Sequence, residues 1–207
     1  MSNFKTPNGN RSLKKMMNSI TEKIVRHCQR MDKLVKNLLT LADIETLPRS
    51  QMMGCDLFTL LEDCMLRVKS AHPDATIDII DETNHEGFIL GDPTLLDLAV
   101  TNLMENGAKY SDKDPVITLT MKEVDENVVL QIADQGIGIP VKDLPHIFDR
   151  FYTVDKARSR KMGGSGLGLS LVKIIIDKHE ATISVSSTVG QGTTFTITFR
   201  KAKKTTG

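Results

Sequence analysis

The chain has few of the residues that mark several large classes of protein. Its 207 residues include no tryptophan, two tyrosines and three cysteines, and its formal net charge is only +1. An odd number of cysteines without a close pair argues against a disulfide framework and against a cysteine zinc site, and favours reduced thiols. The balanced charge gives no electrostatic reason to expect nucleic acid as the main partner.

Long apolar runs are also missing. No stretch reaches the roughly 20 apolar residues that a membrane-spanning helix needs, and no signal peptide opens the chain. We therefore expect a cytoplasmic protein, or the cytoplasmic part of a longer inner-membrane sensor. A length of 207 residues allows one or two domains with a substantial core.

A heptad pattern covers the first part of the chain. Apolar residues recur at alternating steps of four and three, and charged side chains lie between them. Such a narrow apolar stripe predicts a long coiled-coil-like helix that needs partner helices, and so a homodimer through residues 13–41. The apolar positions are Leu13, Met17, Ile20, Ile24, Met31, Leu34, Leu38 and Leu41, with His27 in the gap.

After the segment "ETLPRSQMMG", helical and strand patterns are interleaved. Helices are predicted to begin near Leu57, Asp92 and Gly166. Alternating apolar and polar residues predict strands at "ATIDII", "GFIL", "VITLTMKE", "NVVLQIAD", "ATISVSS" and "GTTFTITFR". This order favours an α+β fold, a two-layer α/β sandwich in which helices cover a mixed sheet.

Three glycine clusters stand out. "ADQGIGIP" places Asp134 at the end of a strand, followed by Gly136 and Gly138. "GGSGLGLS" lies at the start of a helix and "GQGTTF" lies in the last hairpin. Glycines before a helix let backbone N–H groups approach an anion such as phosphate. Each cluster taken alone is better explained as an ordinary turn or helix start, and none has the Walker or dinucleotide-binding pattern.

A polar helix face lies in "NLMENGAKYS". Asn102, Glu105, Asn106 and Lys109 recur at helical spacing and therefore share one side of the helix. The amide oxygen of Asn106 suits Mg²⁺, and the Lys109 ammonium suits phosphate. A solvated surface also explains Glu105 and Lys109, but two asparagines in a helix interior are harder to explain because asparagine is a poor helix former.

In this order, these segments resemble the catalytic, ATP-binding domain of a sensor histidine kinase from a two-component system. "GDPTLLDLAVTNLMENGAKYS" matches the asparagine box, "DQGIGIP" the first glycine motif and "IFDRFY" the phenylalanine box. "GGSGLGLSLVKIIIDKH" and "GQGTTFTI" match the second and last glycine motifs. The resemblance covers about Gly91 to Phe199 and implies the Hsp90-like ATPase fold, which is shared with MutL.

The resemblance also implies roles for single residues. Glu105, Asn106 and Lys109 would be catalytic, with Glu105 polarising the phosphoacceptor and Asn106 ligating Mg²⁺. Asp134 would accept from the amino group of adenine. The implied cofactor-binding set is Asn102, Asn106, Lys109, Tyr110, Asp134, Gly136, Gly138, Arg150, Gly164, Gly166, Leu167, Gly168 and Thr193.

Two groups of residues near the lid over the phosphates have open interpretations. Arg158, Arg160 and Lys161 either approach the phosphates or are solvated loop charges. Phe148, Phe151 and Tyr152 either serve the phenylalanine box or simply pack the base of the lid. Glu180 stands where the family commonly has glycine, in a turn where we expect little effect on function.

The start of the chain departs from the family. "MSNFKTPN" resembles the histidine box Ser-His-Glu-Phe-Lys-Thr-Pro-Leu, but Ser2 stands at the position of the phosphoacceptor histidine. Ser2 is not expected to be phosphorylated, because a hydroxyl is a weak nucleophile without an adjacent base. His27 lies in the apolar seam, where a histidine is more often packed than reactive.

We therefore expect an ATP- and Mg²⁺-binding kinase core of a phosphorelay, with a response regulator as its partner, that does not phosphorylate itself. The alternative is a nucleotide-binding dimerisation or scaffold module without kinase activity. The expected domains are a degenerate histidine-box leader at 1–10, a dimerisation helix at 11–47, a linker at 48–55, a catalytic ATP-binding domain at 56–201 and a disordered tail at 202–207.

Overall fold

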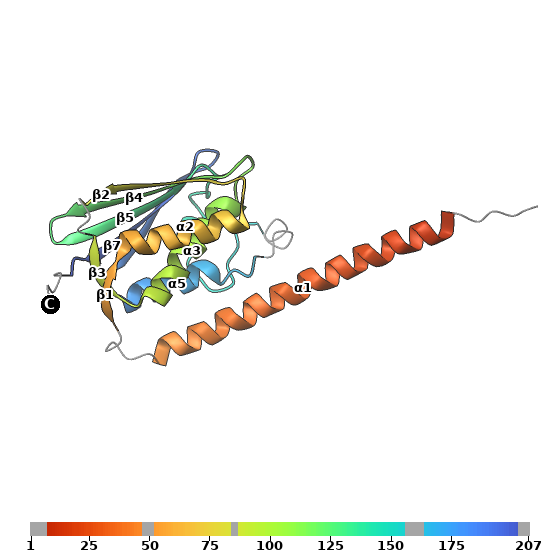
Figure 1. Cartoon of the computed structure of the whole chain (residues 1–207), viewed down its shortest axis with the longest axis horizontal. Coiled ribbons are helices and arrows are strands. Elements are labelled where there is room, and N and C mark those ends of the chain that lie inside the picture. Colours follow the sequence, from red (N-terminus) through yellow and green to blue (C-terminus); the bar gives the residue numbers. More distant parts are fainter. Residues whose placement is uncertain (1–7, 47–51, 84–86, 156–163, 203–207) are drawn as a thin grey trace, which may run out of the picture.

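The computed structural model describes residues 8–46, 52–83, 87–155 and 164–202, and it joins one long helix to an α+β body (Figure 1). Its helices are α1 (Asn8–Thr46), α2 (Leu57–Ala71), α3 (Pro93–Lys109), the short 3₁₀ helix η2 (Leu144–His146) and α5 (Gly168–Lys178). Its strands are β1 (Met53–Asp56), β2 (Thr76–Glu82), β3 (Phe88–Gly91), β4 (Val116–Val124), β5 (Asn127–Asp134), β6 (Thr182–Thr188) and β7 (Gly192–Arg200).

The main sheet has five strands in the order β2-β4-β5-β7-β6. Strand β2 runs parallel to β4 and the other neighbours are antiparallel, so the sheet is mixed as predicted. Residues on its inner face, including Ile117, Leu119 and Ile197, are fully buried. The opposite face presents partly exposed threonines such as Thr118, Thr120 and Thr196, so only one face is covered.

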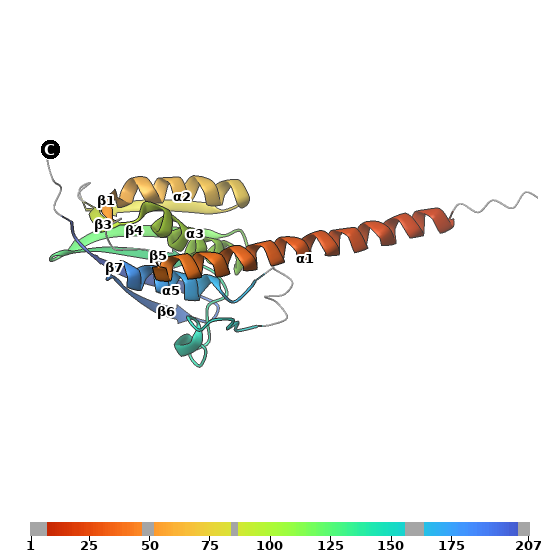
Figure 2. The ribbon, with the colours of Figure 1, turned by 90° about the horizontal axis from the view of Figure 1, so that it is seen from below.

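Helices α2, α3 and α5 cover that inner face, which confirms the predicted two-layer α+β class (Figures 1 and 2). Helix α3 begins where the sequence predicts, because Asp92 accepts hydrogen bonds from the backbone of Thr94 and Leu95 and Pro93 opens the helix. Its apolar side, with Leu96 and Met104, is fully buried. Its polar side therefore points away from the core.

A small second sheet joins the two ends of the body. Strand β1, whose first three residues lie in the predicted linker 48–55, pairs antiparallel with β3. Ile89 of β3 is bridged to Lys201, and the Ala202 N–H donates to the Phe88 carbonyl. Ala202 is buried, so this residue of the predicted tail is part of the body. Residues 203–207 lie outside the described residues.

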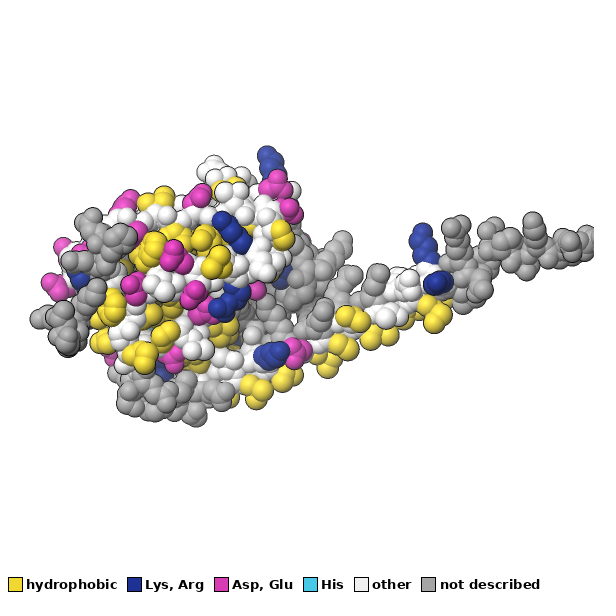
Figure 3. All heavy atoms as spheres, in the orientation of Figure 1, with side chains coloured by type: hydrophobic (Ala, Val, Ile, Leu, Met, Phe, Trp, Pro, Cys, Tyr) yellow, Lys and Arg dark blue, Asp and Glu magenta, His cyan; other side chains and the backbone are white. Residues whose placement is uncertain are grey.

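Helix α1 uses two different sides. Near its end, Leu41 and Ile44 are buried in the core, and the helix lies against α5 (Figure 2). Met17, Ile24 and Met31 are instead 63%, 57% and 65% exposed, and Figure 3 shows apolar side chains along the helix. The predicted seam is thus exposed along most of α1, whereas its last position packs on the body. Among the described residues, no helix is both long and apolar enough to span a membrane.

Candidate functional site

Asp134 lies at the end of β5 with its carboxylate held by the backbone. Its Oδ1 accepts from the N–H of Gly136 at 2.8 Å and from the N–H of Thr193 at 3.2 Å. Burial raises the pKa of the Asp134 carboxyl, and the hydrogen bonds from Gly136 and Thr193 partly oppose that shift. Within the described parts of the chain, Oδ2 has no hydrogen-bond partner, so it is available as an acceptor.

Glycines let the chain pack tightly around Asp134. A Cβ on Gly107 of α3 would lie 3.0 Å from the Asp134 Cβ, and one on Gly136 would lie 2.8 Å from both Asp134 Oδ1 and the Tyr110 carbonyl. Gly138 has a φ of +71°, and a side chain there would collide with the Thr188 carbonyl. The first glycine motif is therefore packed between the end of α3 and the β6–β7 hairpin.

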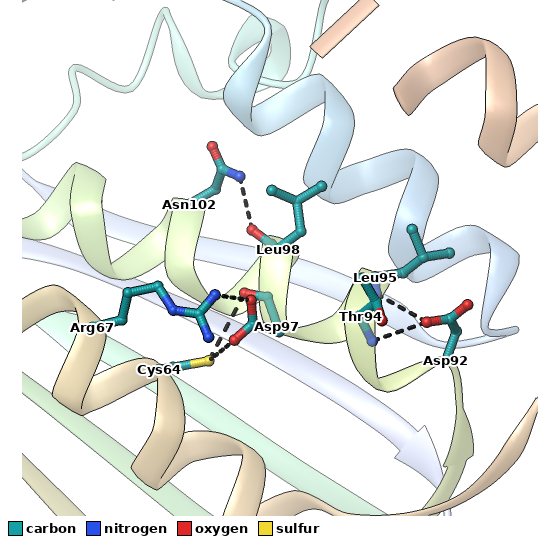
Figure 4. A network of polar contacts seen from close by, with 8 residues as sticks. All are labelled: Cys64, Arg67, Asp92, Thr94, Leu95, Asp97, Leu98 and Asn102. Atoms are coloured by element: carbon teal, nitrogen blue, oxygen red, sulfur yellow. Dashed lines mark hydrogen bonds and ion pairs between the residues drawn. The ribbon is translucent and has the colours of Figure 1, made fainter. Parts of the chain in front are cut away.

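The start of α5 meets α3 at Asn102. A Cβ on Gly168 would lie 3.1 Å from the Asn102 Oδ1, so glycine lets the start of α5 lie close to this side chain. The Asn102 amide donates to the Leu98 carbonyl at 2.7 Å, which leaves its oxygen directed to Gly168 (Figure 4). Leu167 is fully buried ahead of the helix. The first N–H groups of α5 and the Asn102 amide thus form one polar corner.

The predicted polar face of α3 is partly exposed. Glu105, Asn106 and Lys109 are all half-buried, between the buried pairs Leu103–Met104 and Gly107–Ala108. No side-chain hydrogen bond of Asn106 is found among the described residues, so its amide oxygen is free to bind a cation. The Lys109 Nζ lies 5.4 Å from the centre of the Tyr110 ring. These residues share one side of α3 with Asn102, as the spacing predicts.

The phenylalanine box has one packed and one exposed ring. Phe148 packs against the core and meets Phe195 edge to face at 6.5 Å. Phe151 is 62% exposed and adopts a φ of +66°, so the packing interpretation is wrong for this residue. The Phe151 N–H donates to the Gly166 carbonyl at 2.8 Å, which joins the phenylalanine box to the second glycine motif.

The remaining predicted residues lie on the phenylalanine box, on α1, just before α5 or outside the described chain. Arg150 is exposed on the phenylalanine box, and His27 is exposed on α1 in the single chain. Gly164 and Gly166 precede α5, where Gly166 has a φ of +72°. Ser2 and the cations Arg158, Arg160 and Lys161 lie outside the described residues. Among the residues that are described, no group of acids, histidines or cysteines is arranged to hold a metal by itself.

Two polar contacts hold α3 in place. The Arg67 guanidinium donates to Asp97 at 2.6 Å and the Cys64 thiol lies 3.3 Å from the same carboxylate, which ties α2 to α3 (Figure 4). At the other end, His179 after α5 accepts from the Asp92 N–H at 3.0 Å. Sequence reasoning missed both, since no local pattern reveals partners this far apart.

One network near Asp134 was also missed. Ser187 of β6 accepts from the Ile139 N–H and donates to the Gly192 carbonyl, both at 2.8 Å, and its oxygen lies 3.0 Å from Thr193 Oγ1. A serine in "ATISVSS" looks like an ordinary strand residue. No local pattern singles it out, because its contacts are with Ile139 in another loop and with Thr193, which lies opposite it in the register of β6 and β7.

Comparisons with known proteins agree with this geometry. Residues 91–203 match the family model described as histidine kinase-, DNA gyrase B- and HSP90-like ATPase. The sensor-like histidine kinase SenX3 of Mycobacterium tuberculosis is 35% identical over 177 residues, which cover 85% of this chain and 43% of SenX3. The chain spans less than half the length of this relative.

Two solved structures share the fold. The mycobacterial sensor histidine kinase MprB is 26% identical with a TM-score of 0.63, covering 72% of this chain and 97% of that one. Full-length ShkA, solved in complex with AMPPNP, is 22% identical with a TM-score of 0.69, covering 97% of this chain and 41% of that one. The chain therefore belongs to the histidine kinase-, DNA gyrase B- and HSP90-like ATPase family, and it carries the ATP-binding catalytic domain of a sensor histidine kinase.

Proposed function

We propose that this chain binds ATP with Mg²⁺ at the α3–α5 corner and transfers the γ-phosphoryl group to a histidine on another segment or molecule. The observation that carries the proposal is the Asp134 carboxylate, which two backbone N–H groups hold with one oxygen left as an acceptor. It lies at one end of a polar side of α3, and the start of α5 lies further along. A nucleotide would fit along this side of α3 with its base at Asp134 and its phosphates at the start of α5.

Adenine would be recognised at Asp134. The exocyclic amino group of adenine is a donor, and the free Oδ2 of Asp134 is an acceptor. Gly107, Gly136 and Gly138 would keep the Asp134 carboxylate in position by letting the chain pack closely around it, because side chains at these positions would meet neighbouring atoms. Tyr110, Leu167 and Thr193 would complete the surroundings of the base and ribose.

The phosphates would bind where α5 begins. The N–H groups at Gly168 and the glycines before it would face the anion, and the helix dipole favours negative charge there. Lys109 and Arg150 would add positive charge. Asn106 fits a magnesium ion because its amide oxygen is available, and the remaining ligands would be phosphate oxygens and water. When bound, Mg²⁺ would neutralise the phosphate charge.

Glu105 would act on the acceptor. It precedes Asn106 on the same polar side of α3, so its carboxylate would lie beside the phosphates. There it would hold the proton on one ring nitrogen of the acceptor histidine, leaving the other nitrogen to attack in line. Ser2 stands at the histidine position of the box, so we propose that the acceptor is supplied in trans.

The exposed stripe of α1 would bind a second copy of the chain. A row of exposed Met, Ile and Val side chains on an isolated helix calls for a helical partner, and a matching stripe is the simplest one. The contact of α1 with α5 leaves this stripe uncovered. A response regulator would then receive the phosphoryl group, as the resemblance to sensor kinases implies.

The test is phosphorylation with γ-labelled ATP and Mg²⁺, with the chain alone and with a separate helix hairpin that carries a histidine box. We expect acid-labile label on the hairpin and none on the chain. Acid-labile label on the chain alone would contradict supply in trans. ATP binding without any label on either molecule would favour the scaffold alternative.

A matched pair of variants tests the adenine contact. Asp134→Asn keeps the shape of the side chain but replaces the charged carboxylate, which only accepts, with a neutral amide. ATP affinity should therefore fall at least tenfold, or about 1.4 kcal/mol. Asp125→Asn makes the same change at an exposed turn at the other end of β5 and should leave affinity unchanged. Equal affinities for ATP in the two variants would refute the assignment of Asp134.

A further inference from the structure

Ser187 connects the two glycine loops that flank Asp134. The first loop, residues 135–139, follows β5, and the second, residues 189–191, joins β6 to β7. Ser187 lies in β6, half-buried and directly opposite Thr193 in the strand register. Its hydroxyl reaches Ile139 in the first loop and Gly192 beside the second.

The donor and acceptor capacity of this hydroxyl can be assigned completely. A serine hydroxyl has one hydrogen to donate and two lone pairs to accept. The hydrogen is used by the Gly192 carbonyl at 2.8 Å, because a carbonyl can only accept. One lone pair accepts from the Ile139 N–H, also at 2.8 Å.

That assignment determines which hydroxyl donates in the contact between Ser187 and Thr193. The two hydroxyl oxygens lie 3.0 Å apart, and the Ser187 hydrogen is already used. The Thr193 hydroxyl must therefore donate to Ser187, and the Thr193 oxygen keeps only its acceptor capacity. Thr193 is buried, and its N–H donates to Asp134 Oδ1. Next to Asp134, the side chain of Thr193 thus offers a second acceptor and no donor.

We propose that Ser187 is a specificity-determining positioning residue for the nucleotide base, acting through Thr193 and the two glycine loops. This inference rests on the proposed binding of ATP at Asp134. A base with an exocyclic amino group finds acceptors at Asp134 and Thr193. A base with an oxygen at the same position finds no donor there, and a buried acceptor facing another acceptor is costly.

The experiment compares ATP with inosine triphosphate, which carries an exocyclic oxygen in place of the amino group and a hydrogen on ring nitrogen N1, where adenine has none. Dissociation constants are measured by calorimetry on the whole chain with Mg²⁺, for the wild type, Ser187→Ala and Ser187→Thr. In Ser187→Ala the Thr193 hydroxyl is free to turn and donate to the oxygen of inosine. We expect the preference for ATP over inosine triphosphate to fall about tenfold. Ser187→Thr keeps the hydroxyl and should keep the preference.

Ser186→Ala is the matched control, because Ser186 is the exposed neighbour on the same strand. It should leave the preference unchanged. A purely structural role of Ser187 would lower thermal stability but leave the ratio of the two constants within twofold, and that result overturns the inference. If Ser187→Ala does not fold, Ser187→Cys, with its weak hydrogen-bonding thiol, carries the same comparison.

The outcomes separate this inference from the proposed function. A wild type that binds ATP, with a Ser187→Ala variant of unchanged preference, overturns the role of Ser187 alone. A wild type that binds neither nucleotide overturns the proposed function and the inference together. Loss of preference in Ser187→Ala with its retention in Ser187→Thr supports both.

Discussion

His179 joins the end of α5 to the start of α3 as a neutral imidazole. Its Nε2 accepts from the Asp92 N–H at 3.0 Å, and its Nδ1 donates to the Ile175 carbonyl at 2.7 Å. These partners require one protonated and one unprotonated ring nitrogen. Burial lowers the pKa of the His179 imidazole, although the Asp92 carboxylate and the backbone hydrogen bonds oppose the shift.

The pH dependence of stability follows from that direction. Below the ordinary histidine pKa of 6.5, the unfolded chain binds a proton at this residue before the folded chain does, so stability falls as the pH drops. We expect His179→Gln to lose about 1–2 kcal/mol at neutral pH and to remove this part of the pH dependence. Urea unfolding at several pH values measures both the loss of stability and the change in its pH dependence. His72→Gln makes the same substitution at the half-buried end of α2, outside this contact, and serves as the comparison.

Glu180 adopts a backbone conformation that suits glycine. Its φ is +53°, in the left-handed region that costs a residue with a Cβ about 1 kcal/mol. Glu180→Gly should raise the free energy of unfolding by roughly 0.5–1 kcal/mol, part of the gain being offset by chain entropy. Glu180→Ala keeps the Cβ and should gain nothing. Equal thermal unfolding of the two variants would show that the backbone is not strained here.

At the scale of elements, the end of α1 is the contact that attaches the long helix to the body. Ile44 is 1% exposed, whereas Ile24 on the same helix is 57% exposed. Ile44→Ala should cost about 2–4 kcal/mol and increase amide exchange in the last turns of α1. Ile24→Ala makes the same chemical change and should cost less than about 0.5 kcal/mol in the monomer.

For self-association, we expect Ile24→Ala to have the larger effect of the same two variants, which is the reverse of their effects on stability. Ile24 belongs to the exposed stripe that we propose as the dimer contact, and Ile44 does not. Sedimentation should show weaker self-association for Ile24→Ala than for Ile44→Ala. An unchanged dissociation constant in Ile24→Ala would place the dimer contact elsewhere on the chain.

Local patterns predicted most of these elements. The alternation in "VITLTMKE" and "NVVLQIAD" predicts β4 and β5, and Asp92-Pro93 predicts the start of α3, because each signal lies within a few neighbouring residues. Strand β1 was missed, since four residues with Gly54 in the middle form a strand only through pairing with β3.

The residues of the candidate site also fall into two groups, those that a local pattern identifies and those that it does not. Asn102, Asn106, Asp134 and Gly168 could be named because motif spacing places them on a helix face, at a strand end and at a helix start. Ser187 and Gly107 could not, because their importance comes from the distant residues they touch. Phe151 is exposed and has a left-handed backbone, and no sequence pattern reveals either for a phenylalanine.

For the whole molecule, thiol reactivity reports the folded state. Cys28 is exposed on α1, whereas Cys55 and Cys64 are buried. Burial raises the pKa of the Cys64 thiol to about 12, and burial together with Asp56 raises the pKa of Cys55. Because the thiolate is the reactive form, an aromatic disulfide reagent should label Cys28 quickly and the other two only after unfolding. Rapid labelling of all three in native buffer would contradict the fold.

The position of β7 has a consequence for synthesis on the ribosome. This strand, residues 192–200, lies inside the sheet between β5 and β6, and the residues just after it complete the pairing of β3. Until about residue 202 has left the exit tunnel, β5 and β6 both present unpaired edges and the ribbon of β1 and β3 lacks its neighbour. During synthesis, the domain therefore cannot complete its sheet until residues 192–202 have left the exit tunnel. Until then, its unpaired strand edges favour aggregation.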